Sequence, residues 1–414
     1  MDLVDALTIA RQVSSPVGLS ESPVFRRKFS SVYDALVHGE LSDELKSLFS
    51  DDQDPDWETI AGYEVHAVDA TPNERMAAET LADRGVLKAQ PKEPIRYGHK
   101  YSWLVRLVQG GTSWVAPEDI ERISTATTDT KVAAQQVKAL AVRNQRPKVI
   151  TADSRYRDQH FLGIFADLEN TCALVRLQNN QKLSQEPVPK PEGSRGAPRK
   201  HGADFQLTAI QREPQALEEF FLGKQNVRVR VWHKLHFKRL APVKGSVICV
   251  EFLKEDGTPR YKRPLWLFWT GPQEVRPQDL CRMYLWRFAI EHLFRFLKQH
   301  LGLNSHRSSN LESLQRWMWI VALAYWQLLL IRDTVQPNRP AWHPRRKDGQ
   351  GKPLTPSQVQ RSAQAFLLLS GSPAPNPRPA GKGTGRQNGY HPTPRKRYEI
   401  VFKTKHAQTL PKTC

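Results

Sequence analysis

Two short apolar runs that each end in aspartate constrain the fold of this chain more than any other feature. The run YEVHAVD ends at Asp69, and the run KVITAD ends at Asp153. Both have the length and composition of strands. A single aspartate at a strand end is often only a turn or cap residue. Two of them favour a shared site, because an unpaired carboxylate is costly to bury in a core.

The segments around these runs predict alternating strands and helices. Further strands are expected at HKYSWLVRLV, TSWVA and CALVRLQ, and helices at DTKVAAQQVKALAVRN and RDQHFLGIFADLE. The resulting order of strand, strand, strand, helix, strand, helix and strand predicts an α/β layer arrangement.

Composition divides the chain into five predicted regions. Short helices are expected first, then the first part of the α/β core, a mostly β insertion, the last core strand with the C-terminal helices, and a basic Pro-rich tail. These regions span residues 1–60, 61–179, 180–262, 263–335 and 336–414. The insertion begins with a loop rich in Pro, Gly and charge and continues with alternating stretches typical of antiparallel strands.

The segment after the insertion predicts a helix from Pro277 to Gln299 with a distinctive polar stripe. At about 100° per residue, Tyr284, Arg287, Glu291 and Lys298 fall on one stripe, beside an apolar stripe that includes Phe288. The simpler interpretation is an amphipathic helix whose solvated face carries an Arg–Glu pair. The two strand-end aspartates favour the alternative, a site shared with Glu291.

The charge distribution indicates a polyanionic partner. The net charge is +19, with −7 in residues 1–60, +13 in 61–335 and +13 in 336–414. Lysine and arginine displace counterions from phosphate, so a basic body with a basic tail favours nucleic acid. Charge alone leaves open a generic RNA-binding protein.

A membrane protein and a disulfide-stabilised protein are both disfavoured. The longest apolar stretch, 317–331, is shorter than the ~20 residues that cross a bilayer, so a buried helix is predicted there. The four cysteines are scattered and form no C-x-x-C pair, which fits a reducing cytoplasm.

Asp69, Asp153 and Glu291 form a predicted oxygen-ligand set for Mg²⁺ or Mn²⁺. Two such ions, about 3.5–4 Å apart, can activate an attacking water or 3′-hydroxyl and stabilise the leaving oxygen in phosphoryl transfer. Arg287 and Lys298 would grip a DNA backbone, and Tyr284 would hydrogen-bond a phosphate oxygen.

These residues resemble those of a known family. Tyr284, Arg287, Glu291 and Lys298 have the spacing of the Y-R-E-K motif of cut-and-paste insertion-sequence transposases with a DDE triad. VDAT around Asp69 and TADSRY around Asp153 look like the strands that carry the first two acids of that triad. The resemblance covers about residues 60–335, and the 138 residues between Asp153 and Glu291 leave room for the family's β insertion.

The resemblance implies an RNase H-like core, a mixed sheet flanked by helices and interrupted by the β insertion before the last catalytic helix. It also implies a transposase that uses two Mg²⁺ ions, with Mn²⁺ as a substitute, held by Asp69, Asp153 and Glu291. Expected partners are the terminal inverted repeats of the transposon, target DNA and a second copy of the chain in a synaptic homodimer. A bacterial, nucleoid-associated cytoplasmic location follows.

Further DNA contacts are expected in the insertion and at its end. In relatives that cut through a hairpin, a tryptophan stacks on a flipped base, and Trp266 is the matching residue, with Trp269 as second choice. Trp266 could equally be a core or sheet-face aromatic. The basic loop with Arg195, Arg199, Lys200 and His201 is a further candidate for DNA recognition, since residues 1–60 are acidic.

Two other functions remain open at this point. An RNase H-like DNA nuclease would share the acids but would cut without joining. A non-catalytic DNA-binding derivative of a mobile element would bind DNA without needing them.

Overall fold

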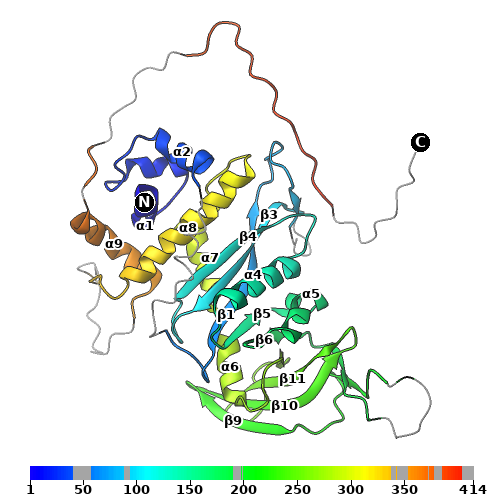
Figure 1. Cartoon of the computed structure of the whole chain (residues 1–414). Coiled ribbons are helices and arrows are strands. Elements are labelled where there is room, and N and C mark those ends of the chain that lie inside the picture. Colours follow the sequence, from blue (N-terminus) through cyan, green and yellow to red (C-terminus); the bar gives the residue numbers. More distant parts are fainter. Residues whose placement is uncertain are drawn as a thin grey trace, which may run out of the picture.

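The computed structural model describes residues 1–40, 57–87, 94–189, 197, 199–336, 342, 353–371, 373–376 and 385–402. One large mixed sheet runs through the molecule, with helices on both of its faces (Figure 1). The predicted α/β class, a mixed sheet flanked by helices, is confirmed.

The sheet has twelve strands in the order β2-β3-β1-β5-β6-β12-β11-β10-β7-β8, with β4 paired to β3 and β9 paired to β10. Their bounds are β1 (Glu64–Glu74), β2 (Gly85–Val86), β3 (Tyr97–Leu107), β4 (Val115–Ile123), β5 (Lys148–Ala152), β6 (Thr171–Arg176), β7 (Lys182–Gln185), β8 (Asp204–Gln206), β9 (Ala216–Leu222), β10 (Gln225–Phe237), β11 (Leu240–Leu253) and β12 (Leu265–Trp269).

The unit β4-β3-β1-β5-β6 has the strand order and directions expected of an RNase H-like core. β1, β5 and β6 are parallel neighbours, whereas β3 is antiparallel to both β1 and β4. Helix α4 (Asp129–Arg143) provides the crossover from β4 to β5, and the Thr128 side chain caps its first turn. Asp153 directly follows the carboxyl end of β5, as predicted, whereas β1 continues past Asp69 to Glu74, so Asp69 lies within its strand rather than at its end.

The insertion continues the core sheet. β12 pairs with β6 on one side and with β11 on the other, so backbone hydrogen bonds run without interruption from the core into the hairpin β10–β11. Thr270, just after β12, adds a hydrogen bond from Ala173 N to its Oγ1 at 2.8 Å. The antiparallel strands predicted for the insertion are present.

Side chains alternate between two hydrophobic clusters, one on each face of the sheet. In β1, Val65 and Ala67 join the cluster formed with α6 (Pro277–Trp286), α7 (Ala289–Gln299) and α8 (Leu311–Ile331). Val68 joins the cluster formed with α4 and α5 (Gln159–Leu162). By this alternation, Asp69 lies on the α7 face of β1 and His66 on the α4 face.

Helices from both ends of the chain pack together on α8. Helices α1 (Asp2–Ile9) and α2 (Ser30–His38), with the 3₁₀ turn η1 (Pro16–Glu21), contact α8 at one end of the molecule (Figure 1). Helix α9 (Pro356–Ser370) packs on α1 and α8 and buries Val359 and Ala363. Reading 336–414 only as a Pro-rich tail missed α9, although Thr355 and Gln358 form a capping box at its start.

Helix α8 is long and apolar enough to cross a membrane by length and composition, and it is the one such helix among the described residues. Of its most apolar window, 67% is buried inside the protein, as expected for a core helix. Trp317, Trp319 and Tyr325 lie at 1% exposure or less, which confirms the predicted buried helix.

The helix predicted over 157–169 is much shorter in the structure. Only α5 is α-helical there, followed by the 3₁₀ turn η3 (Gly163–Ala166) and preceded by the 3₁₀ turn η2 (Ser154–Tyr156). Asp158 caps α5 by accepting hydrogen bonds from His160 N and Phe161 N.

Candidate active site

The register of β1 and β5 brings Asp69 and Asp153 side by side. Val68 pairs with Ala152 in parallel, and the next residue in each chain segment is Asp69 or Asp153. Neighbouring strands lie about 4.8 Å apart, and residues at one level of a parallel pair point to the same face. Both carboxylates are therefore expected on the α7 face of the sheet.

Local hydrogen bonds fix the direction of both carboxylates. Asp69 Oδ1 accepts from Ala70 N at 2.8 Å. Asp153 Oδ1 accepts from Arg155 N at 2.8 Å and so caps the 3₁₀ turn η2. Each aspartate keeps its second carboxylate oxygen for another partner.

The pKa of Asp69 reflects its burial and the charges near it. Burial is the largest cause that raises the pKa of Asp69, and repulsion from Asp153 adds to it. The Arg287 guanidinium opposes both, and the resulting pKa is about 6. A carboxyl pKa raised this far is typical of a functional site, because the fold has left part of the negative charge uncompensated.

The helix predicted from Pro277 to Gln299 is wrong in one respect, because it breaks within the motif. Helix α6 ends at Trp286 and α7 begins at Ala289. At the break, Arg287 N donates to Tyr284 O and Ile290 N donates to Arg287 O, so hydrogen bonds join residues three apart. This tighter turn winds about 120° per residue, which changes the predicted stripe.

The break also turns Phe288 outward. The sequence places Phe288 on the apolar stripe, but its side chain is 52% exposed and stands edge-on against His292, with ring centroids 5.1 Å apart. The residue before it, Arg287, points inward and is only 9% exposed.

Arg287 joins two of the predicted acids. Its Nη1 lies 3.5 Å from Asp69 Oδ2, and its Nη2 donates to Glu291 Oε1 at 3.0 Å. Burial works against the charged guanidinium, but Tyr284, Asp69, Glu291 and Asp153 together raise the pKa of Arg287. Three carboxylates far apart in the sequence thus surround one buried cation.

Tyr284 and Lys298 occupy different positions around this cation. Tyr284 is 6% exposed, and the Arg287 guanidinium lies over its ring at 5.8 Å from the centroid. Lys298, at the end of α7, is half-buried, and burial lowers its pKa while Glu74 and Asp69 oppose this. The structure brings Tyr284 and Lys298 to the acidic site, with Tyr284 mostly covered.

The donor set fits a divalent cation in its chemistry, although Glu291 is engaged elsewhere. No group of three His, Cys, Asp or Glu side chains within the described ranges is already arranged to hold a metal ion. Asp69 and Asp153 are adjacent and repel each other, as carboxylates that share a cation do. Glu291 would join them by leaving its ion pair with Arg287.

The two predicted tryptophans differ in their surroundings. Trp266 packs against Trp232, with ring centroids 5.9 Å apart, and lines a cavity of about 930 Å³ together with Ser154 and Arg176. Trp269 is 1% exposed, and its Nε1 donates to Pro272 O at 2.8 Å. Trp269 is a core aromatic. Trp266 is 5% exposed and also belongs to a hydrophobic core cluster, but it borders a cavity beside the segment that follows Asp153.

The basic loop lies away from the acids, on the insertion. Arg199 and Lys200 are exposed, and Arg195 lies outside the described residues. His201 is fixed to β10, since its Nδ1 lies 2.9 Å from His236 Nε2 and the two rings stack. The structure therefore does not gather Arg199 and Lys200 with the acidic triad.

Tyr156 is a buried neighbour of the acids that sequence reasoning did not single out, and it packs against Phe161 in the hydrophobic cluster on the α4 face of the sheet. It is 1% exposed, its hydroxyl has no hydrogen-bond partner among the described residues, and burial with nearby Asp69 and Asp153 raises its pKa well above the ordinary value. Its position three residues after Asp153, in TADSRY, was the one available signal.

Comparison with known proteins identifies the kind of chain. The sequence profile described as the transposase DDE domain matches residues 120–327, about half of the chain. No curated protein sequence matches it. The solved structures that match include a piggyBac transposase in a synaptic complex with hairpin DNA, at 12% identity and a TM-score of 0.37. The match covers 75% of this chain and 53% of that chain, so this chain spans about half the length of its counterpart.

Proposed function

Because the chain belongs to the family of transposases with a DDE domain, we propose that it cuts the ends of a mobile DNA element and joins them to target DNA. The observation that supports this most directly is the placement of Asp69 and Asp153 at neighbouring parallel strands, with Arg287 linking Asp69 to Glu291. The negative charge of these three carboxylates is only partly compensated by Arg287.

Transposases of this class generally use divalent metal ions. Asp69, Asp153 and Glu291 would hold them, with Mg²⁺ as the natural ion and Mn²⁺ as a substitute. Bound metal supplies a lowered pKa for an attacking water or 3′-hydroxyl and stabilises charge on the leaving oxygen. With two ions per site, one would activate the nucleophile and the other would stabilise the leaving oxygen.

Arg287 has a positioning role in this proposal. Its guanidinium pairs with Asp69 and Glu291 and orients both carboxylates, and Glu291 would leave this ion pair in order to hold a metal ion. Once released from Glu291, the Nη2 group is free to bind a DNA phosphate, as Arg commonly does. Lys298 supplies a second positive charge at the far end of α7, beside Asp69.

The expected DNA contacts of the remaining residues are part of the same proposal. The Tyr284 ring lies under the Arg287 guanidinium and helps to orient it. Because Tyr284 is mostly covered, it would contact DNA only through the exposed edge of its ring. Trp266 borders a cavity next to Ser154, which is large enough for an extrahelical base. Arg199 and Lys200 would bind DNA outside the catalytic centre.

The chain would act as a homodimer on the terminal inverted repeats and target DNA. A bacterial cytoplasmic location fits the described cysteines Cys172, Cys249 and Cys281, which are buried and free.

The test uses the full chain, Mg²⁺ and a duplex carrying the inverted repeats that flank the gene. We expect cleavage at the repeat and a strand-transfer product with a second duplex. Asp153→Asn should abolish both. Cutting without a joined product would instead support a nuclease, and DNA binding with neither product would support a non-catalytic derivative.

A further inference from the structure

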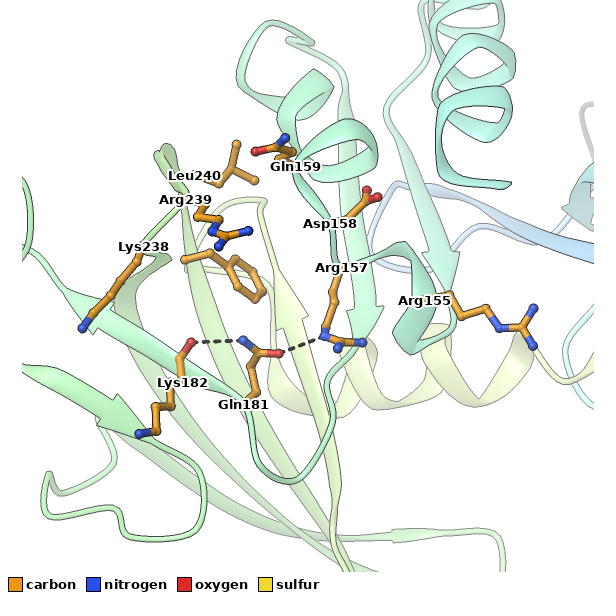
Figure 2. A pocket seen from close by; sticks show the side chains of 10 residues that line it. Arg155, Arg157, Asp158, Gln159, Gln181, Lys182, Lys238, Arg239 and Leu240 are labelled. Atoms are coloured by element: carbon orange, nitrogen blue, oxygen red, sulfur yellow. Dashed lines mark hydrogen bonds between the residues drawn. The ribbon is translucent and has the colours of Figure 1, made fainter. Parts of the chain in front are cut away.

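A cationic cavity of about 480 Å³ lies between the segment that follows Asp153 and the hairpin that joins β10 to β11 (Figure 2). Five cationic residues from three separate segments line it, and together they are called the cation track here. They are Arg155, Arg157, Lys182, Lys238 and Arg239. The function proposed above uses none of them.

The charges of the cation track are spread out rather than focused on one point. Figure 2 shows the charged ends of Lys238, Lys182, Arg239 and Arg157 at separate points around the cavity, whereas the Arg155 side chain extends away from them. A small anion such as free phosphate would need these groups to converge. An extended polyanion matches a line of separate cations better.

Arg157 is held in a fixed orientation by neutral partners. Its Nε donates to Gln181 Oε1 at 2.9 Å, its Nη2 donates to Gln178 Oε1 at 2.8 Å, and its Nη1 donates to Ser154 O. Because all three acceptors are uncharged, the positive charge is positioned but not neutralised. Such a preorganised guanidinium is suited to binding an anion.

One member of the cation track is paired with a carboxylate, since Arg155 Nη1 lies 3.7 Å from Asp129 Oδ2. The other nearby carboxylates do little to neutralise the track. Asp158 is the one carboxylate lining the cavity, and it already caps α5 and accepts from Thr130 Oγ1 at 2.7 Å. Lys238 pairs with Asp204 at 2.8 Å, but both side chains are more than half exposed, where such pairs contribute little. Arg239 has no ion-pair partner in the described part of the chain.

We propose that the cation track holds the phosphate backbone of a DNA strand as it passes the acidic site. This inference rests on the proposed function, since it assumes that the reacting phosphodiester lies at Asp153. Arg155 follows Asp153 by two residues, so the track begins within about 7 Å of chain from the acid. Phosphates recur about every 3.4 Å along the axis of each strand, so several can contact the track at once. The strand belongs either to the transposon end or to the target.

The test compares two triple variants of the full chain. The track variant is Lys182→Ala, Lys238→Ala and Arg239→Ala, which removes exposed cations and leaves Arg157 in place. The control is Lys138→Ala, Lys224→Ala and Arg361→Ala, which removes three exposed cations from elsewhere. Circular dichroism checks that both variants are folded.

Fluorescence anisotropy then measures the dissociation constant at several salt concentrations for two duplexes. One duplex carries the terminal repeat and the other is a random sequence. For at least one duplex, the track variant should bind about tenfold more weakly at low salt, with a salt slope reduced by about 2 to 3. The control should bind as the wild type does. A loss of affinity for the terminal-repeat duplex alone would assign the bound strand to the transposon end. A loss for the random duplex as well would assign it to target DNA.

Unchanged affinity and slope on both duplexes would overturn the cation track, and so would equal losses in the two variants. A charge-preserving variant, Lys238→Arg with Arg239→Lys, should retain the wild-type slope.

Cleavage is followed in the same samples. If the wild type binds through the track but neither cuts nor joins, the proposed function fails and the track stands. If the wild type cuts and the track variant binds normally, the track fails alone.

Discussion

Strand β1 carries two groups of buried charge on opposite faces, and they are organised in opposite ways. Near its start, on the α4 face, His66 lies between Glu64 and Glu118, with nitrogen–oxygen distances of 3.4 and 3.2 Å. Arg106 lies 3.2 Å from Glu64, so cations surround these carboxylates. Five residues after Glu64, on the α7 face, Asp69 shares one buried arginine with two other acids.

The two carboxyl groups have opposite pKa shifts. Burial alone would raise the pKa of Glu64, but His66, Arg106 and Asn144 lower it to about 2. Burial and Asp153 raise the pKa of Asp69 to about 6 despite Arg287. Glu64 therefore stabilises the fold as a carboxylate, whereas Asp69 as a carboxylate destabilises it until another cation arrives. Within one strand, unbalanced charge distinguishes a site from a structural ion network.

The largest expected effect comes from Asp153→Asn, which should reduce DNA cleavage at least about a thousandfold, since a lost metal ligand costs several kcal/mol of transition-state stabilisation. The fold should persist, because the change removes repulsion against Asp69. A gel cleavage assay measures the effect, with the exposed Asp167→Asn as control. Normal cleavage by Asp153→Asn would remove the assigned ligand.

Glu64→Gln should have the opposite consequence, a loss of stability with little effect on the chemistry of folded molecules. The folded pKa of Glu64 is about 2 and its ordinary value 4.5, so its contribution is complete above pH 4.5 and is lost as the pH falls toward 2. The shift corresponds to about 3 kcal/mol at neutral pH.

Urea denaturation from pH 7 to pH 2 measures this contribution. The wild type should lose stability steeply below pH 4.5, and the variant should start lower with a flatter acid limb. An unchanged acid limb would show that Glu64 and Asp69 do not differ as described.

Arg287→Gln should reduce both DNA cleavage and the stability of the fold. Without the guanidinium, Asp69 and Glu291 lose their common partner, and cleavage should fall about ten- to hundredfold. The stability lost at pH 8 should be partly restored by Mg²⁺, which neutralises the same carboxylates. Circular dichroism should remain native. An unfolded variant would make Arg287 purely structural.

The smallest expected effect is a thermal shift of the wild type by Mg²⁺. The pKa of Asp69 is raised to about 6, so the folded state binds this proton more tightly than the unfolded state does between about pH 4 and 6. The contribution of Asp69 to the free energy of unfolding therefore falls as the pH rises toward 6. Mg²⁺ should raise the melting temperature by about 2 to 4 °C at pH 8 and not at pH 4.5. An equal shift in Asp153→Asn would locate the ion elsewhere.

Part of the candidate site could be predicted from the sequence because its signals are local. A short apolar run that ends in an acid identified both strands, and Asp153 does lie at the end of β5. The prediction that Asp69 ends its strand is wrong, because β1 continues in pairing with β3 as far as Glu74. The same reasoning failed at the break between α6 and α7. Neither Gly nor Pro marks it, and Phe288 is an ordinary apolar residue on an ideal helix.

The features that depend on tertiary contacts could not be predicted. Arg287 faces Asp69 only because α7 packs on the same face of β1, across more than two hundred residues of chain. The cation track combines residues near 155, 182 and 238, and no local pattern joins them. Helix α9 did have a local signal in its capping box, which the surrounding prolines obscured.

The pairing of β12 with both β6 and β11 limits how this protein can change in length. A single residue added within β12 would shift its register and turn every following side chain of the strand to the other face. Trp266 and the β10–β11 hairpin would then move relative to Asp153. Turns such as the one between β9 and β10 can instead lengthen without this effect, because they lie outside the strands next to Asp69 and Asp153. Variation among related chains should therefore accumulate at the loops of the insertion, while the number of residues in β12 stays constant.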